Sequence, residues 1–132
     1  MCSSRAGLAA IHAGWRGLVA GVIEATLAAL AAPTVELEAW LGPAIGRCCY
    51  EVGDDVAASV SASSSGSVVT AGRSGRPHLD LHQAAEIQLR KLGIARVRRV
   101  PQCTKCHSDL LWSYRGDRAT RGRNLALAWL SL

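Results

Sequence analysis

Two spacings of apolar residues alternate along this chain. Short apolar stretches bounded by glycine, proline or charged residues are typical of strands, whereas longer stretches rich in alanine and leucine are typical of helices. The predicted strands cover residues 7–12, 36–41, 94–100, 110–114 and 124–132, with a further short strand at Val68 and Val69. The predicted helices cover residues 18–32, 53–61 and 81–92. The order of these elements predicts a mixed α/β domain of the α+β kind.

The ends of the predicted helices carry residue types that start or stop a helix. Pro33 closes the first helix, because proline lacks the N–H that would continue the hydrogen-bond ladder. Asp80 is placed to cap the last helix, with Gln83 three residues later as in a capping box, and Gly93 follows as a C-cap. Residues 42–46 predict a turn, and the Ser- and Gly-rich residues 61–76 predict a surface loop.

Composition indicates one globular domain over residues 1–132. The chain is 49% apolar and 19% charged, which argues against extended disorder. No apolar run is long enough to cross a membrane, since the most apolar one, residues 18–32, carries Glu24 and Thr26. The N-terminus lacks the unbroken apolar stretch of a secretory signal peptide. We therefore expect a cytoplasmic protein that does not enter the membrane.

The formal net charge of +5 comes mostly from arginines in the C-terminal half. Such a balance either forms a solvated basic face or attracts phosphates, nucleotides and acidic surfaces, and the sequence leaves both readings open. No aromatic residues interleave with the basic run RKLGIARVRRV, and no helix-turn-helix or zinc-finger spacing is present. Nucleic acid is therefore not an expected partner.

Five cysteines, an odd number, favour free thiols or metal ligands over a disulfide framework. The stretch CTKCH, residues 103–107, matches the haem-attachment pattern of c-type cytochromes, but the chain offers no export signal and no methionine besides Met1 as axial ligand. A zinc knuckle would need a second ligand pair of similar spacing, and the adjacent Cys48 and Cys49 predict a poor bite around one ion. A thioredoxin-like pair would stand at a helix N-terminus rather than after a strand. We expect Cys106 to be a structural thiol.

Three of the four histidines have no distinctive setting. His78 and His82 are four residues apart and could share a metal on one helix face. Asp80 as the N-cap places His78 outside that helix, however, so we expect a loop side chain and a structural role for the pair. His107 has no clear assignment.

His12 differs because it ends a predicted strand and is followed by flexible backbone. Gly14 and Gly17 let the chain turn there, and Arg16 lies close by in the sequence. This is typical of an active-site edge in an α/β protein. A core histidine packed beside Trp15 would leave a similar pattern, so both readings stay open.

Four motifs occur in a fixed order: HAGWRG from residue 12, LGPAIGRCCYEVG from residue 41, HLDL from residue 78, and CT at residue 103 followed by SYRGDRATRGR from residue 113. In their order and spacing, residues 7–132 resemble the YfiH-like family of polyphenol oxidase or laccase-domain proteins, whose members are zinc-dependent purine nucleoside enzymes. The resemblance implies a YfiH-like fold, with β-sheet layers flanked by helices. It also implies phosphorolysis of adenosine or inosine, with nucleoside and phosphate as partners, and deamination of adenosine.

The resemblance assigns roles to individual residues. His12 would be one of three zinc ligands, and the other two, a histidine and a cysteine, belong to motifs upstream of HAGW. Arg16 would act with His12 in the catalytic site. The resemblance also implies that four residues bind substrate: Cys48, Cys49, Arg115 and Arg123. Relative to the family pattern, one residue is inserted between Arg115 and Arg123.

The chain begins after those upstream motifs, so we expect it to match the C-terminal part of a family member. By itself the chain should bind zinc weakly or not at all, because the single imidazole of His12 cannot make a closed site and metal affinity depends on the number of ligands. The alternative is a catalytically incomplete remnant or binding module with the same fold and no complete metal site. A copper oxidase is not expected, since no set of histidines and cysteines resembles a multicopper cluster.

Overall fold

A computed structural model of the chain describes residues 2–4, 7–116 and 122–129. Its main sheet has the strand order β2-β1-β3-β6. The strands are β1 (Cys2–Ser4), β2 (Gly7–Ala9), β3 (Glu38–Leu41) and β6 (Arg96–Arg99). Neighbouring strands are antiparallel except β3 and β6, which run parallel with Ala39 opposite Val97. The expected mixed α/β architecture is confirmed.

Within the described residues, a second, two-stranded sheet, four α-helices and two short 3₁₀ helices complete the fold. Strands β4 (Val69–Ala71) and β5 (Pro77–Leu79) form an antiparallel hairpin. The α-helices are α1 (Trp15–Val19), α2 (Val22–Leu30), α3 (Asp54–Ser63) and α4 (Leu81–Lys91). Two short 3₁₀ helices, η1 (Thr34–Glu36) and η2 (Gly66–Val68), precede β3 and β4.

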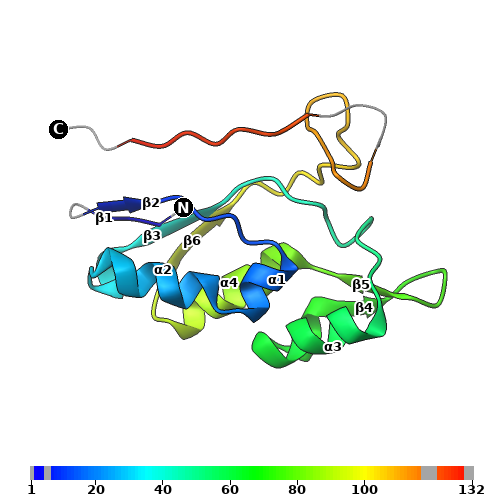
Figure 1. Cartoon of the computed structure of the whole chain (residues 1–132), viewed down its shortest axis with the longest axis horizontal. Helices are drawn as coiled ribbons and strands as arrows, with labels where there is room; N and C mark the ends of the chain where they lie inside the picture. The colour runs from blue at the N-terminus through cyan, green and yellow to red at the C-terminus, as the bar shows by residue number, and fades with distance from the viewer. Residues whose placement is uncertain (1, 5–6, 117–121, 130–132) are drawn as a thin grey trace.

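The core lies between the main sheet and the helices. Figure 1 shows α1, α2 and α4 on one side of the main sheet, while residues 122–129 run past its other side. Leu18 of α1, Ile23 of α2 and Leu89 of α4 are almost completely buried in this layer. Burying side chains of this size contributes about 1.5–3 kcal/mol each. None of the helices in the described part of the chain is long and apolar enough to span a membrane.

The single helix expected over residues 18–32 is wrong, because the structure divides it in two. Gly21 separates α1 from α2 in the left-handed region, with φ of 75°, which glycine adopts without steric cost. The helical chain also starts earlier, at Trp15, and stops at Leu30. Ala31 takes the left-handed C-cap with φ of 50°, so the helix ends before Pro33 is reached.

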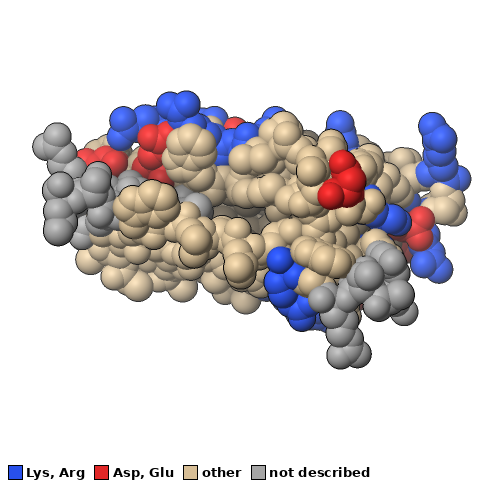
Figure 2. Space-filling model, turned by 90° about the horizontal axis from the view of Figure 1, so that it is seen from above, with Lys and Arg blue, Asp and Glu red and all other residues tan. Residues whose placement is uncertain are grey.

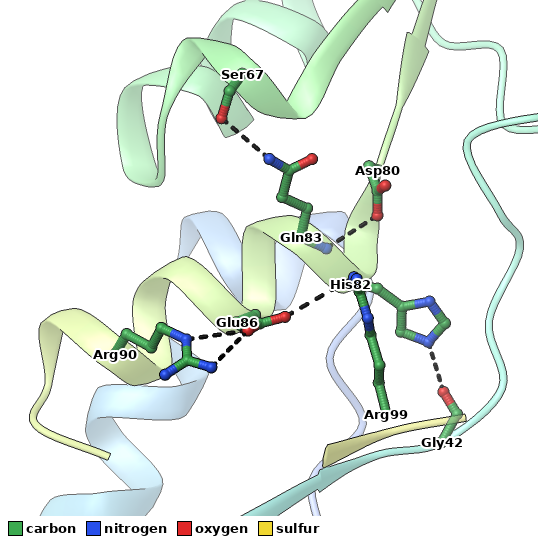
Figure 3. A network of polar contacts seen from close by, with 8 residues as sticks. All are labelled: Gly42, Ser67, Asp80, His82, Gln83, Glu86, Arg90 and Arg99. Atoms are coloured by element: carbon green, nitrogen blue, oxygen red, sulfur yellow. Dashed lines mark hydrogen bonds and ion pairs between the residues drawn. The ribbon is translucent and has the colours of Figure 1, made fainter. Parts of the chain in front are cut away.

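The expected cap of α4 is confirmed, but the capping box is not. Asp80 accepts a hydrogen bond from the backbone N–H of Gln83 at 2.9 Å (Figure 3). The Gln83 side chain turns instead to the Ser67 hydroxyl, at 3.2 Å. The Asp80 N–H is already bound to the Val68 carbonyl at 2.8 Å, which explains why it does not need Gln83. Gly93, with φ of 90°, follows the helix as expected.

Removing this cap should weaken the fold measurably. In Asp80→Ala the Gln83 N–H loses its acceptor, and a lost N-cap costs about 1 kcal/mol. The change should appear as a lower urea midpoint with an unchanged m-value. Asp80→Asn keeps an acceptor oxygen and serves as the matched control. Equal midpoints for the alanine variant and the natural chain would contradict the capping role.

Two expected strands near the C-terminus are wrong within the described residues. Residues 110–114 form turns and irregular chain, and residues 124–129 are extended without strand pairing. Asn124 instead holds Trp112, whose N–H donates to Asn124 Oδ1 at 2.9 Å and whose carbonyl accepts from Nδ2 at 2.8 Å. Leu125 and Leu127 stay more than four-fifths exposed. An alternating pattern can form a strand only where a neighbouring strand supplies hydrogen bonds.

The remaining differences concern lengths. The first expected strand ends at Ala9 rather than at residue 12, and the one over 94–100 is reduced to β6. The expected helix over 53–61 extends through Ser63. Within the predicted loop 61–76, η2 and β4 occur, and β5 follows directly after it.

Candidate functional site

The candidate site is built from two segments that leave the parallel strands β3 and β6. An isolated parallel bridge between Ala44 and Cys103 continues the strand pairing beyond both strands. The Thr104 N–H donates to the Ala44 carbonyl at 3.0 Å. The segment after β3 and the segment after β6 therefore lie side by side at the carboxyl end of these strands, the usual place for ligand sites in open sheets.

Four cysteines meet where these segments touch. The Sγ atoms of the four-cysteine cluster all lie within 4.8 Å of one another; its members are Cys48, Cys49, Cys103 and Cys106. Cys106 Sγ is 3.6 Å from that of Cys48 and 3.4 Å from that of Cys49. The adjacent Cys48 and Cys49 were expected to suit one ion poorly, yet both belong to this group, whose spacing could hold a metal ion. A tight turn, in which the Cys49 and Tyr50 N–H groups both donate to the Gly46 carbonyl, brings both thiols to the same side.

The thiols of the cluster differ in acidity. Burial is the largest influence on the pKa of Cys48, and with the hydrogen bond to Cys106 it raises that pKa to about 12. Burial also raises the pKa of Cys49. For Cys103 burial acts in the same direction, but backbone N–H groups of Gly46, Cys106 and Lys105 together lower the pKa to about 6. Cys103 is therefore more ready to ionise at neutral pH than Cys48 or Cys49.

The two histidines at 78 and 82 anchor the segment that carries the first cysteine pair. His78 belongs to β5, not to a loop as expected, and its Nδ1 lies 2.7 Å from the Arg47 carbonyl. His82, on α4, places Nε2 2.7 Å from the Gly42 carbonyl (Figure 3). Because each ring binds a different backbone carbonyl, the pair holds residues 42–47 in place, in keeping with the structural role expected for it.

Tyr50 connects the cluster to two of the predicted arginines. Its ring is buried, and the Arg115 guanidinium lies over it, 5.1 Å from the centroid. Arg115 also donates from Nη1 to the Glu51 carbonyl at 3.1 Å. Burial raises the pKa of Tyr50, while the charges of Arg115 and Arg16 lower it, so both arginines act on the same phenol. The sequence gives no sign of this link, because Tyr50 and Arg115 are far apart along the chain.

His12 is exposed in the loop that joins β2 to α1. A Cβ added at Gly14 would lie 3.6 Å from His12 Nε2, and one at Gly17 would lie 3.5 Å from the His12 carbonyl. The exposed setting does not match a histidine packed into the core. Among the described residues the group suited to a metal is the four-cysteine cluster, so His12 does not stand in a complete metal site there.

The other predicted arginines lie in different surroundings. Arg16 stacks on Trp15, with its guanidinium 4.6 Å from the ring centroid. Arg123 donates from Nη1 to the carbonyl of Gly122, its own neighbour, at 2.8 Å. Part of the motif between Arg115 and Arg123, residues 117–121, lies outside the described residues.

The basic run over β6 forms ion pairs within the chain. Arg98 pairs with Glu38, and Arg99 lies 3.8 Å from Glu86, which also binds Arg90 at 2.8 Å (Figure 3). Lysine and arginine side chains follow one edge of the face in Figure 2, with acidic side chains among them. Exposed pairs of this kind contribute about 0–1 kcal/mol. This run therefore matches a solvated basic face better than a dedicated anion site.

Solved structures with the same arrangement define the class of fold. The chain superposes on a Neisseria meningitidis protein with a TM-score of 0.74 and 38% identity, covering 79% of this chain and 44% of that one. YlmD from Geobacillus stearothermophilus gives a TM-score of 0.73 at 31% identity, covering 84% and 44%. A Bacillus licheniformis protein described as YfiH gives 0.73 at 27% identity. The fold is that of the YfiH-like proteins.

The sequence comparison places the chain in a family. The family described as multi-copper polyphenol oxidoreductase laccase matches residues 1–131, and the chain belongs to it. A purine nucleoside phosphorylase of Pseudomonas aeruginosa is 40% identical over 126 residues, which cover 93% of this chain and 52% of that protein. Purine nucleoside phosphorylase YfiH of Escherichia coli is 38% identical over 130 residues, covering 96% and 53%. The chain thus spans about half the length of these curated relatives.

Proposed function

We propose that this chain carries part of the active site of an enzyme that splits purine nucleosides with phosphate. The observation that carries the proposal is the Arg115 guanidinium over the buried Tyr50 ring, a phenol on which the charge of Arg16, in the same segment as His12, also acts. Two guanidinium groups acting on one buried phenol form a positive site suited to a phosphate dianion. The names of the relatives, purine nucleoside phosphorylases, support the same chemistry.

In this proposal each residue has a distinct task. Arg16 and Arg115 bind phosphate and hold it for attack on the ribose carbon that bears the base. Tyr50 supports the Arg115 guanidinium from below through its ring, a cation–π contact. Cys48 and Cys49 brace the segment next to Tyr50, and Arg123 binds the nucleoside. Adenosine and inosine are the proposed substrates, with deamination of adenosine as a second activity.

The proposed zinc ligand is His12, through neutral imidazole. Among the described residues, His12 belongs to no group of three or more side chains that could hold a metal, so we derive no catalytic step through the ion. When bound by further ligands from outside this chain, zinc would polarise an oxygen of substrate or water. A copper centre of the multicopper type is not proposed, because the metal-suited group here consists of cysteines without histidine.

The proposed location is the cytoplasm. The cysteines resolved in the described part are free thiols, which is the usual state in a reducing compartment. A binding module that retains the fold without activity is the second candidate, favoured by the absence of a complete metal site at His12 among the described residues. Direct assay decides between the two.

The assay uses the zinc-loaded protein in its full natural length. Incubation with adenosine and phosphate should yield adenine and ribose 1-phosphate, and inosine should yield hypoxanthine. Formation of inosine from adenosine reports deamination separately. Replacing phosphate by sulfate is the matched control and should stop phosphorolysis but not deamination. If none of these products forms, the binding-module reading replaces the enzyme reading.

Arg115 offers a sharper test of phosphate binding. Arg115→Ala should raise the KM for phosphate about 10- to 100-fold, because a charge-assisted hydrogen bond of about 1.5–3 kcal/mol is lost. The KM for adenosine should change much less. Arg115→Lys keeps the charge but loses the planar, forked arrangement of donors. Its KM for phosphate should therefore lie between those of the natural protein and Arg115→Ala. Parallel increases in both KM values, with a lower melting temperature, would show that Arg115 only holds its segment in place.

A further inference from the structure

We propose that the four-cysteine cluster is a metal site that binds one zinc ion through four thiolates. This site is separate from His12 and does not depend on the proposed enzymatic activity. It ties the segment after β3 to the segment after β6 and so fixes the surroundings of Tyr50.

The geometry of the sulfur atoms fits one tetrahedral ion. With zinc–sulfur bonds of about 2.3 Å, the sulfurs of a tetrahedral site lie about 3.8 Å apart. In the cluster, Cys106 lies 3.6 Å from Cys48 and 3.4 Å from Cys49, and all four sulfurs lie within 4.8 Å. Small side-chain rotations would bring them to the required spacing.

The backbone is shaped to admit four sulfurs at this point. A Cβ added at Gly46 would lie 3.0 Å from Cys103 Cβ and 3.2 Å from Cys48 Sγ, closer than side chains normally approach. The Gly46 N–H donates to Cys103 Sγ at 3.2 Å. Glycine here therefore leaves room for the sulfurs and supplies a hydrogen bond that favours the thiolate form.

Ligand chemistry selects the ion. Four thiolates in tetrahedral array are typical of zinc or iron, whereas magnesium and calcium prefer oxygen ligands. Closed sites with four protein ligands are structural, because no position remains for water or substrate. Binding would release the thiol protons to solvent as four sulfur–zinc bonds form, without any change of oxidation state. Cys48 and Cys106 are exposed, so the ion can reach the site from solvent.

The position of the site indicates what it stabilises. The two cysteine pairs are far apart in sequence, with Cys48 and Cys106 separated by 58 positions. The first pair immediately precedes Tyr50, and the segment after the second pair leads to Arg115, which lies over the Tyr50 ring. A zinc ion joining the pairs would restrict both sides of this contact.

Metal content and cobalt spectroscopy of the purified 132-residue chain test the proposal. The protein is produced without a metal-binding tag, kept reduced, supplied with zinc and freed of loose metal by gel filtration. Elemental mass spectrometry should detect about one zinc ion per chain. Cobalt-loaded protein should show thiolate-to-cobalt charge-transfer absorption in the near ultraviolet and intense tetrahedral bands in the visible. The cobalt spectrum needs no variant, so it stands even if a cysteine variant fails to fold.

Matched variants separate this site from others. Cys48→Ser and Cys106→Ser should lose most of the bound metal, while Cys2→Ser, the fifth cysteine, should keep it. His12→Ala should also keep it, which separates failure of this site from failure of the proposed enzyme. No zinc in the reduced natural chain, iron in its place, or loss of zinc in His12→Ala would each overturn the proposal.

Discussion

Replacing His12 by alanine is expected to lower kcat/KM for adenosine phosphorolysis at least about 100-fold. Loss of a residue that only supports a metal ligand already lowers metal affinity or activity by up to about 100-fold. The proposed zinc would lose a direct ligand. Because His12 is exposed, its removal leaves no cavity, and surface substitutions usually change stability by less than about 0.5 kcal/mol. The melting temperature should therefore change by less than about 3 °C. Steady-state kinetics and thermal unfolding of the same preparation provide both readings.

The control for this variant is a nearby exposed side chain with no proposed role. Val19, at the end of α1, is 40% exposed, and Val19→Ala should keep full activity. Unchanged kinetics in His12→Ala would remove the histidine from the site. A large fall in its melting temperature would assign it a structural role instead.

Local signals made α4 predictable from the sequence. The cap at Asp80 and the glycine at position 93 bound a helix whose apolar residues face the core, and each of these signals acts within a few residues. The division at Gly21 was harder to foresee, because a single glycine inside a helical pattern is often tolerated. The C-terminal strands were predicted wrongly because their pattern says nothing about whether a partner strand lies alongside.

For the site as well, local motifs predicted individual residues, whereas contacts between distant segments could not be predicted. The likeness of the HAGWRG segment to its family pointed to His12 and Arg16. The four-cysteine cluster was missed, because adjacent cysteines look unsuitable as ligands until the turn at Gly46 is known. The contact between Arg115 and Tyr50 joins two segments brought together by the pairing of β3 with β6. The spacing of residues within either segment does not predict this contact.

Replacing Leu79 by alanine is expected to cause a large loss of stability, about 2–5 kcal/mol. Leu79 is fully buried at the end of β5, and its N–H donates to the Tyr50 carbonyl at 3.0 Å. Truncation removes buried apolar surface and leaves a cavity that tightly packed neighbours cannot fill. Urea unfolding should show a lower midpoint. Leu110→Ala, the same change at a side chain that is 76% exposed, should cost less than about 0.5 kcal/mol. Equal losses in the two variants would mean that the hairpin carrying Leu79 does not pack into the core, and that Tyr50 is held without it.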